Sequence, residues 1–173
     1  MYSNTQMTWK LGTLNDENKH FYLDMFLSQH IQHTPAKLIS ELNILDFKTH
    51  LTTLWNNSVA VHNENEKYRI YDYVDSKGKC IAFMLGIYEE PSFHIRHFCF
   101  DNIEVITDNY KKIMFEFFEQ DEYINYITVR SRKGIPIYHI FLLYIGFKES
   151  DNGFFPSVYC SDTHKEYELQ SVR

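Results

Sequence analysis

Hydrophobic and polar positions change their spacing several times along the middle of the chain. Residues 93–101 are aromatic and apolar without helical spacing, which predicts a largely buried strand. After a polar break, apolar residues recur at intervals of three and four with charged residues between them, which predicts an amphipathic helix packed on a sheet. This helical spacing is carried by Ile106, Tyr110, Ile113, Met114 and Phe117.

A second strand and a second helix follow. Residues 126–129 predict the strand, and a basic turn at residues 130–134 leads to Pro136, which suits the first turn of a helix. That helix is expected to end at Gly146 with a left-handed cap. The order strand, helix, strand, helix predicts that the two strands are parallel neighbours that splay apart at one end.

Upstream of this unit the pattern predicts a β-meander. Residues 68–74 and 80–87 are strand-like, and residues 75–79 between them contain Gly78 at a place typical of a hairpin turn. With the strands downstream, these segments predict a mixed sheet of about six or seven strands.

This order of elements resembles the GNAT superfamily of N-acetyltransferases over nearly the whole chain. The match comprises a first strand in residues 7–14, helices between about residues 16 and 56, the meander, the central helix and a final hairpin in residues 147–172. Residues 144–149, Tyr-Ile-Gly-Phe-Lys-Glu, are similar to the "leucine-glycine-phenylalanine" ending of the family's last helix. The resemblance implies an α+β (α/β) fold of three layers, with helices on both sides of the mixed central sheet, and one domain over residues 1–173.

The activity implied by the resemblance is N-acyl transfer from acetyl-CoA, or another acyl-CoA, to an amine of a small molecule or peptide. In the family, an arginine- and glycine-rich loop after the fourth strand holds the coenzyme A pyrophosphate with backbone amides at a helix N-terminus. Here that loop contains no glycine, and Asp108 brings negative charge toward an anion. The implied cofactor-binding positions are Phe98, Cys99 and Phe100 beside the pantetheine arm, and Val105, Ile106, Thr107, Asp108, Asn109 and Tyr110 in the loop.

Because this loop should bind the coenzyme A pyrophosphate weakly, the basic turn at residues 130–134 is a second candidate site for the coenzyme phosphates. Arg130, Arg132 and Lys133 could face a coenzyme phosphate, but a solvated turn between a strand and a helix explains the same residues.

The family's usual acid is a tyrosine four residues before the final glycine of the last helix, and Leu142 stands there. Tyr138 lies one turn earlier on the same helical face, whereas Tyr144 points away. Tyr138 is therefore the candidate to protonate the leaving thiolate. A structural tyrosine with a satisfied hydroxyl is the alternative, because the chain has 13 tyrosines and 14 phenylalanines. The candidates for the base that takes the amine proton are Glu89, Glu90 and His97.

The spacing of the histidines and cysteines bears on two other kinds of site, a nucleophilic pair and a metal site. On a regular strand His94 and His97 should point to opposite faces, and His97 and Cys99 should share a face with Phe93 and Ile95. A Cys–His pair could support nucleophilic acyl transfer, or be a buried thiol beside a hydrogen-bonded histidine. No set of His, Cys, Asp or Glu has metal-ligand spacing, so no metal is expected.

Composition narrows the remaining classes. The net charge of −6 and the pI near 5.8 argue against a nucleic-acid binder. No apolar run is long enough for a membrane span, and the first six residues lack a charged leader and an apolar core, so neither membrane insertion nor secretion is expected. Three cysteines in strand-like contexts indicate reduced thiols and a cytoplasmic location.

Two hypotheses stay open at this point. The first is an acyl-coenzyme A dependent N-acyltransferase. The second is a catalytically inactive GNAT-like fold that serves as a protein- or ligand-binding module, since fold alone does not confer activity. The acceptor and the oligomeric state are not set by the sequence.

Overall fold

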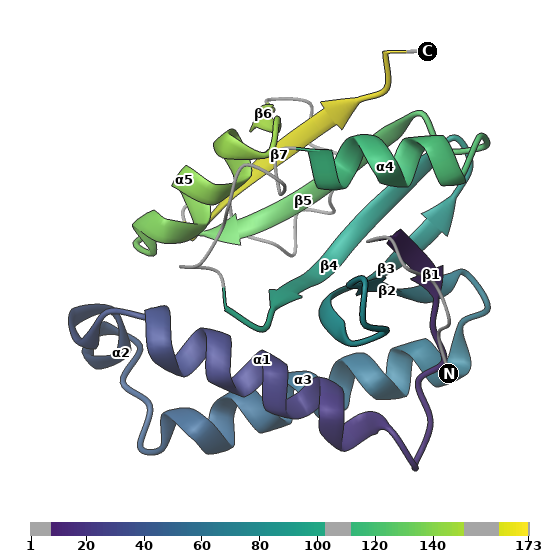
Figure 1. The fold of residues 1–173 in the computed structure, drawn as a ribbon. Helices are drawn as coiled ribbons and strands as arrows, with labels where there is room; N and C mark the ends of the chain where they lie inside the picture. The colour runs from purple at the N-terminus through teal and green to yellow at the C-terminus, as the bar shows by residue number, and fades with distance from the viewer. Residues whose placement is uncertain (1–7, 103–111, 151–162, 173) are drawn as a thin grey trace.

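The computed structural model describes residues 8–102, 112–150 and 163–172, and it has a three-layer α+β architecture (Figure 1). One seven-stranded mixed sheet lies between two groups of helices. The strands are β1 (Thr8–Leu11), β2 (Tyr68–Val74), β3 (Cys80–Glu89), β4 (Ser92–Phe100), β5 (Tyr126–Arg132), β6 (Lys148–Glu149) and β7 (His164–Gln170). The helices are α1 (Lys19–His33), α2 (Ala36–Glu41), α3 (Phe47–Glu64), α4 (Ile113–Gln120) and α5 (Pro136–Tyr144). The predicted fold class is confirmed.

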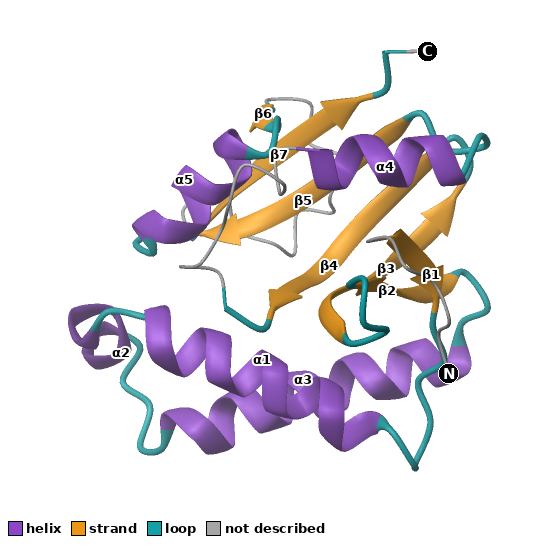
Figure 2. Cartoon of the chain, in the orientation of Figure 1, coloured by secondary structure: helices purple, strands orange, loops and turns teal. Residues whose placement is uncertain are grey.

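The sheet has the strand order β1-β2-β3-β4-β5-β7-β6. All neighbouring strands are antiparallel except β4 and β5, which are parallel, so the predicted parallel pair is confirmed (Figure 2). The predicted meander is also confirmed, because β2 and β3 form a hairpin whose turn contains Gly78 with a positive φ of 83°.

Each face of the sheet has its own hydrophobic core. On the side of α4 and α5, strand residues such as Phe93 and Ile95 pack with Phe117 and Phe141. On the side of α1 and α3, the fully buried Phe26 and Trp55 pack against β3 and β4. Most of the aromatic side chains that the structure describes belong to these two cores or pack against them, and their burial stabilises both layers.

Local signals explain the helix ends that border the site. Asp46 caps α3, because its carboxylate accepts a hydrogen bond from the Thr49 amide at 3.2 Å. Helix α5 ends in a Schellman motif, in which the Phe147 amide donates to the Leu142 carbonyl and the Gly146 amide to the Leu143 carbonyl. Gly146 has a φ of 110°, so the predicted glycine cap is confirmed.

A β-bulge in β4 corrects one expectation about its faces. The register shifts between Leu85, which opposes His97, and Gly86, which opposes Ile95, so that Arg96 is an extra residue on β4. A bulge reverses the alternation of side chains beyond it. The prediction that His97 shares a face with Ile95 is therefore wrong, and so is the prediction that His94 and His97 point to opposite faces.

Other boundaries also differ from the prediction. Residues 130–132 belong to β5 and not to a turn, because they continue the antiparallel ladder with β7 as far as the pair Arg132 and His164. Helix α3 runs to Glu64, beyond the predicted end near residue 56. The first strand is shorter than residues 7–14. The implied coenzyme loop at residues 105–110 lies outside the described residues.

Candidate functional site

The site begins where the two parallel strands part. β4 and β5 are paired only from Ser92 and Tyr126 to Ile95 and Val129, although β4 continues to Phe100 and β5 to Arg132. Their ends diverge in Figure 2. A cleft of about 730 Å³ opens at this point, and α1, α2, α3 and α5 also line it. The bulge makes this separation possible, because it bends β4 and increases its twist just after the last paired residue.

Tyr138 of α5 reaches from its helix to α1 at the edge of the cleft. Its hydroxyl lies 3.0 Å from Nδ1 of His30 and 3.4 Å from the Gln29 carbonyl oxygen. Burial, with a smaller contribution from the Cys99 thiol, raises the pKa of Tyr138, whereas burial and the neighbouring His33 lower the pKa of His30 to about 4. At neutral pH a protonated tyrosine and a neutral imidazole therefore share this hydrogen bond. Leu142 also lines the cleft, as their shared helical face predicts.

His97 lines the cleft on the α1 and α3 side. Its Nε2 lies 2.7 Å from Oγ of Ser58, which also accepts a hydrogen bond from Nε of Arg96 at 3.0 Å. Consecutive residues of a regular strand cannot both reach one side chain on one face, so these contacts are a direct result of the bulge. Burial, then His30 and Arg96, lower the pKa of His97 well below its usual value. His97 is therefore neutral and only a weak base.

Cys99 is fully buried and is not among the cleft-lining residues. Desolvation raises the pKa of its thiol, so the thiol stays protonated at neutral pH. The nucleophilic Cys–His pair is therefore not assembled, and the alternative of a buried thiol beside a hydrogen-bonded histidine describes the geometry.

The two glutamates considered as bases lie elsewhere. Glu89 ends β3 and Glu90 follows it in the turn to β4, both exposed, at the paired end of β4. Neither lines the cleft, and the carboxylate of Glu90 accepts a hydrogen bond from Tyr88 at 3.4 Å. The structure thus brings Tyr138 and His97 to one cleft and does not bring Glu89 or Glu90 there.

Gln29 is a site residue that the sequence analysis missed. Its Nε2 donates to the Phe98 carbonyl at 3.1 Å, and its Oε1 accepts from the Phe100 amide at 2.7 Å. The Asp101 amide donates to the Ile81 carbonyl of β3. Backbone groups of successive strand residues point to opposite sides, so those of Phe98 and Phe100 point away from β3, toward the gap between β4 and β5. A polar residue on the buried face of α1, three residues after Phe26, was the available signal.

Arg96, Arg130 and Arg132 line the cleft, together with His164 of β7. Burial, then Arg132 and Arg130, lower the pKa of His164 to about 4, so it is neutral beside them. Of the three residues predicted to form a basic turn, Arg130 and Arg132 therefore face the cleft from β5, while Lys133 does not line it.

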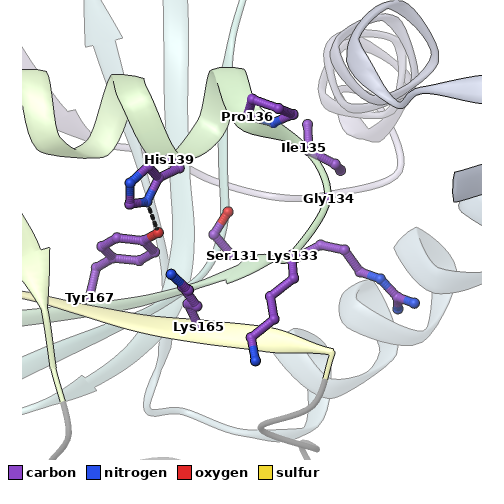
Figure 3. A pocket seen from close by; sticks show the side chains of 9 residues that line it. Ser131, Lys133, Gly134, Ile135, Pro136, His139, Lys165 and Tyr167 are labelled. Atoms are coloured by element: carbon purple, nitrogen blue, oxygen red, sulfur yellow. Dashed lines mark hydrogen bonds between the residues drawn. The ribbon is translucent and has the colours of Figure 1, made fainter.

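Lys133 belongs to a second, smaller cavity of about 310 Å³ between the start of α5 and β7 (Figure 3). Arg132 and Lys165 also line this cavity, and His139 of α5 is hydrogen-bonded there to the hydroxyl of Tyr167. Lys165 is in addition paired with Glu149 at 3.1 Å. Of the three predicted basic residues, Arg130 thus lines only the cleft, Lys133 only the smaller cavity, and Arg132 both.

Metal sites and membrane-spanning helices are absent from the part of the chain that the structure describes. No three His, Cys, Asp or Glu side chains there converge on a position for a metal ion. Within the same residues, no helix combines the length and the apolar character that crossing a bilayer requires.

Comparisons with known proteins agree with this architecture. By sequence, the chain matches no protein-family model and no curated protein. Spermidine N-acetyltransferase from Vibrio cholerae, solved with coenzyme A and spermine, superposes with a TM-score of 0.56 at 13% identity over 97% of both chains. A GNAT-family acetyltransferase from Staphylococcus aureus gives 0.57 at 15% identity over 94% of this chain and 99% of that one. The PaiA N-acetyltransferase from Thermoplasma acidophilum, solved with coenzyme A, gives 0.58 at 11% identity over 95% and 99%. The chain has the GNAT fold.

Proposed function

We propose that the protein transfers an acyl group from a coenzyme A thioester to an amine, and that both substrates meet in the cleft between β4 and β5. The observation that carries the proposal is the parting of this parallel pair after Ile95 and Val129, which opens a cleft of about 730 Å³. Two proteins of the same fold, the spermidine N-acetyltransferase and the PaiA N-acetyltransferase, were solved with coenzyme A. The gap provides strand backbone and an apolar wall for an extended pantetheine arm.

The reaction would join the amine nitrogen to the acyl carbon and release a thiol. Tyr138 keeps its proton at neutral pH, so it can donate a hydrogen bond to the sulfur as negative charge develops there. Complete proton transfer from Tyr138 is uphill, because an ordinary thiol has a pKa of about 8.5 and the pKa of Tyr138 is raised above the usual tyrosine value of about 10. Tyr138 therefore acts as a hydrogen-bond donor, and the proton that the amine nitrogen loses as the C–N bond forms and the C–S bond breaks reaches the sulfur through water.

The other groups in the cleft position the reactants. His97 can accept a hydrogen bond from the amine but is too weak a base to deprotonate an ammonium ion. The amine must therefore bind in its neutral form. Catalysis would rest mainly on holding amine and acyl donor together, an effect that can supply several kcal/mol.

A second candidate is a binding module without catalysis, and Gln29 is the observation that favours it. Its side chain already pairs with the Phe98 carbonyl and the Phe100 amide, two backbone groups that an amide-containing arm could otherwise use. For coenzyme A to use these groups, the Gln29 side chain would have to move aside.

Thermal unfolding with coenzyme A separates the two candidates. A ligand at a hundredfold its dissociation constant stabilises the native state by about 2.7 kcal/mol. For a chain of this size we expect the melting temperature to rise by about 5–10 °C. The variant Gln29→Ala should bind with equal or higher affinity, and the exposed change Lys48→Ala is the control. If coenzyme A stabilises neither the wild type nor Gln29→Ala, the acyltransferase proposal is wrong.

A further inference from the structure

We infer that the acceptor is an amine that also carries an anionic group, a carboxylate or a phosphate, on an apolar body, and that polyamines are excluded. That the ligand is an acyl acceptor rests on the proposed function. That it carries an anionic group is argued from the charge of the cleft. The protein as a whole is acidic, with a net charge of −6. The cleft has the opposite character.

The cationic character comes from the side chains that face the cleft. Three arginines line it and carry its positive charge, whereas His30, His97 and His164 among the five lining histidines are neutral, and no Asp or Glu is among the described lining residues. The arginines are Arg96, Arg130 and Arg132, and the histidines are His30, His50, His94, His97 and His164. All three arginines are partly buried, so their charges are screened less than those of fully exposed side chains.

The nearest acidic groups on neighbouring elements do not cancel these charges. Glu166 of β7 is the register partner of Arg130. Glu168 is two residues further along β7, and its carboxylate accepts hydrogen bonds from Tyr126 and Ser150. Glu89, at the exposed turn, lies close enough to act on His94. Of these three carboxylates only Glu166 is the register partner of one of the arginines, so the described side chains give the cleft a net positive charge.

Arg132 is the strongest candidate to receive the anion. Its register partner on β7 is His164, which burial and the two arginines keep neutral. Among the described residues, Arg132 forms no ion pair. A guanidinium can bind a carboxylate or a phosphate through two parallel hydrogen bonds, so the ligand would provide the missing counter-charge.

The rest of the cleft fits an apolar body and a neutral amine. Apolar side chains of α2, α3 and the connection between them line the cleft, namely Leu38, Leu42, Phe47, Leu51 and Leu54. Nearby positive charges disfavour an ammonium ion and lower the pKa of a bound amine, which prepares it for attack on the acyl carbon. A polyamine would bring several further positive charges into the same cleft and be repelled.

Matched pairs of amines test the inference without any acyl donor. Calorimetry with L-phenylalanine and L-phenylalaninamide compares the same amine and ring with and without a carboxylate, and phosphoethanolamine and ethanolamine form the phosphate pair. We expect the member that carries the carboxylate or phosphate to bind at least tenfold more tightly than its partner without that group, in at least one pair. Spermidine should not bind measurably. Equal binding within both pairs, tighter binding of spermidine or no binding of any probe would overturn the inference.

Variants locate the anion and separate the two proposals. Arg132→Gln should reduce the preference for the anionic amine at least tenfold, whereas Lys165→Gln, which removes one positive charge from the other cavity, should not change it. The comparison within pairs on the wild type stands even if Arg132→Gln folds poorly. Acyl transfer from acetyl-CoA is then measured with the same amines. Selective binding without transfer would contradict the proposed function alone, and transfer to both members of a pair at equal kcat/KM would contradict the inference alone.

Discussion

Gly86→Ala tests the feature on which the cleft depends. Gly86 lies on β3 opposite the bulge of β4, and a Cβ atom at this position would lie 2.2 Å from the His94 carbonyl oxygen and 2.9 Å from Cα of Ile95. Both contacts are with backbone atoms, which cannot move aside as the end of a side chain can. Alanine at position 86 therefore requires the two central strands to separate.

The size of the effect follows from these distances. A carbon and an oxygen atom approach normally to about 3.3 Å, so the strands would have to move apart by about 1 Å at this point. A hydrogen bond stretched by that amount is lost, at about 1 kcal/mol, and overpacking a core costs about 1–3 kcal/mol. We expect Gly86→Ala to lower the free energy of unfolding by about 2–4 kcal/mol.

Urea unfolding followed by tryptophan fluorescence measures this change, because Trp9 and Trp55 are buried. With a slope of about 2 kcal/mol per molar urea, the midpoint should fall by about 1–2 M. Gly146→Ala is the control: its φ of 110° is strained for alanine, but its Cβ would only touch a Leu169 methyl group at 3.5 Å, so about 1–2 kcal/mol is expected. If Gly86→Ala is as stable as the wild type, the described register of the bulge is wrong, and so is the cleft built on it.

Two further predictions concern the titrating groups of the cleft. Tyr138→Phe should lower kcat about 10- to 100-fold, equivalent to about 1.4–2.7 kcal/mol, and reduce stability by about 1 kcal/mol through the unpaired His30 nitrogen. The matched control is Tyr144→Phe on the exposed side of α5, and an unchanged kcat for Tyr138→Phe would remove this residue from the mechanism. Stability should also fall as the pH drops from 7 to 5, because His30, with a pKa of about 4, stays neutral in the folded state while the unfolded state, with a pKa near 6.5, binds a proton. This histidine alone should lower the free energy of unfolding by up to about 2 kcal/mol at pH 5. Equal urea midpoints at the two pH values would contradict the described burial of His30.

The elements that could be predicted are those encoded by local periodicity. The parallel neighbours β4 and β5 follow from the order strand, helix, strand, and the end of α5 follows from Gly146, whose left-handed conformation few other residues adopt. The hairpin at Gly78 has the same kind of local cause. Tyr138 and Leu142 share a helical face wherever the helix lies, so their common place in the cleft could also be expected.

The features that could not be predicted depend on pairing across the chain. The bulge is not visible in the sequence, because Phe93, Ile95, His97 and Cys99 alternate as in a regular strand and only pairing with β3 shows that Arg96 is extra. Gln29 contacts β4 across about 70 positions of sequence, which no local pattern reveals. The basic residues 130–132 look like a turn when considered alone, but they extend β5 because β7 offers them a partner strand.

One inserted residue connects the fold to the chemistry of the site. Because Arg96 is extra, Arg96 and His97 lie on the same face and both reach the buried Ser58 of α3, whose hydroxyl also donates to the Leu54 carbonyl. A hydroxyl has only one proton, and Ser58 donates it to the Leu54 carbonyl. In the hydrogen bond between Ser58 and His97, the proton therefore belongs to Nε2 of His97. The other ring nitrogen, Nδ1, is then the hydrogen-bond acceptor. Helix α3 thus stabilises the bulge and selects the tautomer of His97. The same bulge bends β4 away from β5, so the opening of the cleft and the orientation of its groups have a single structural cause.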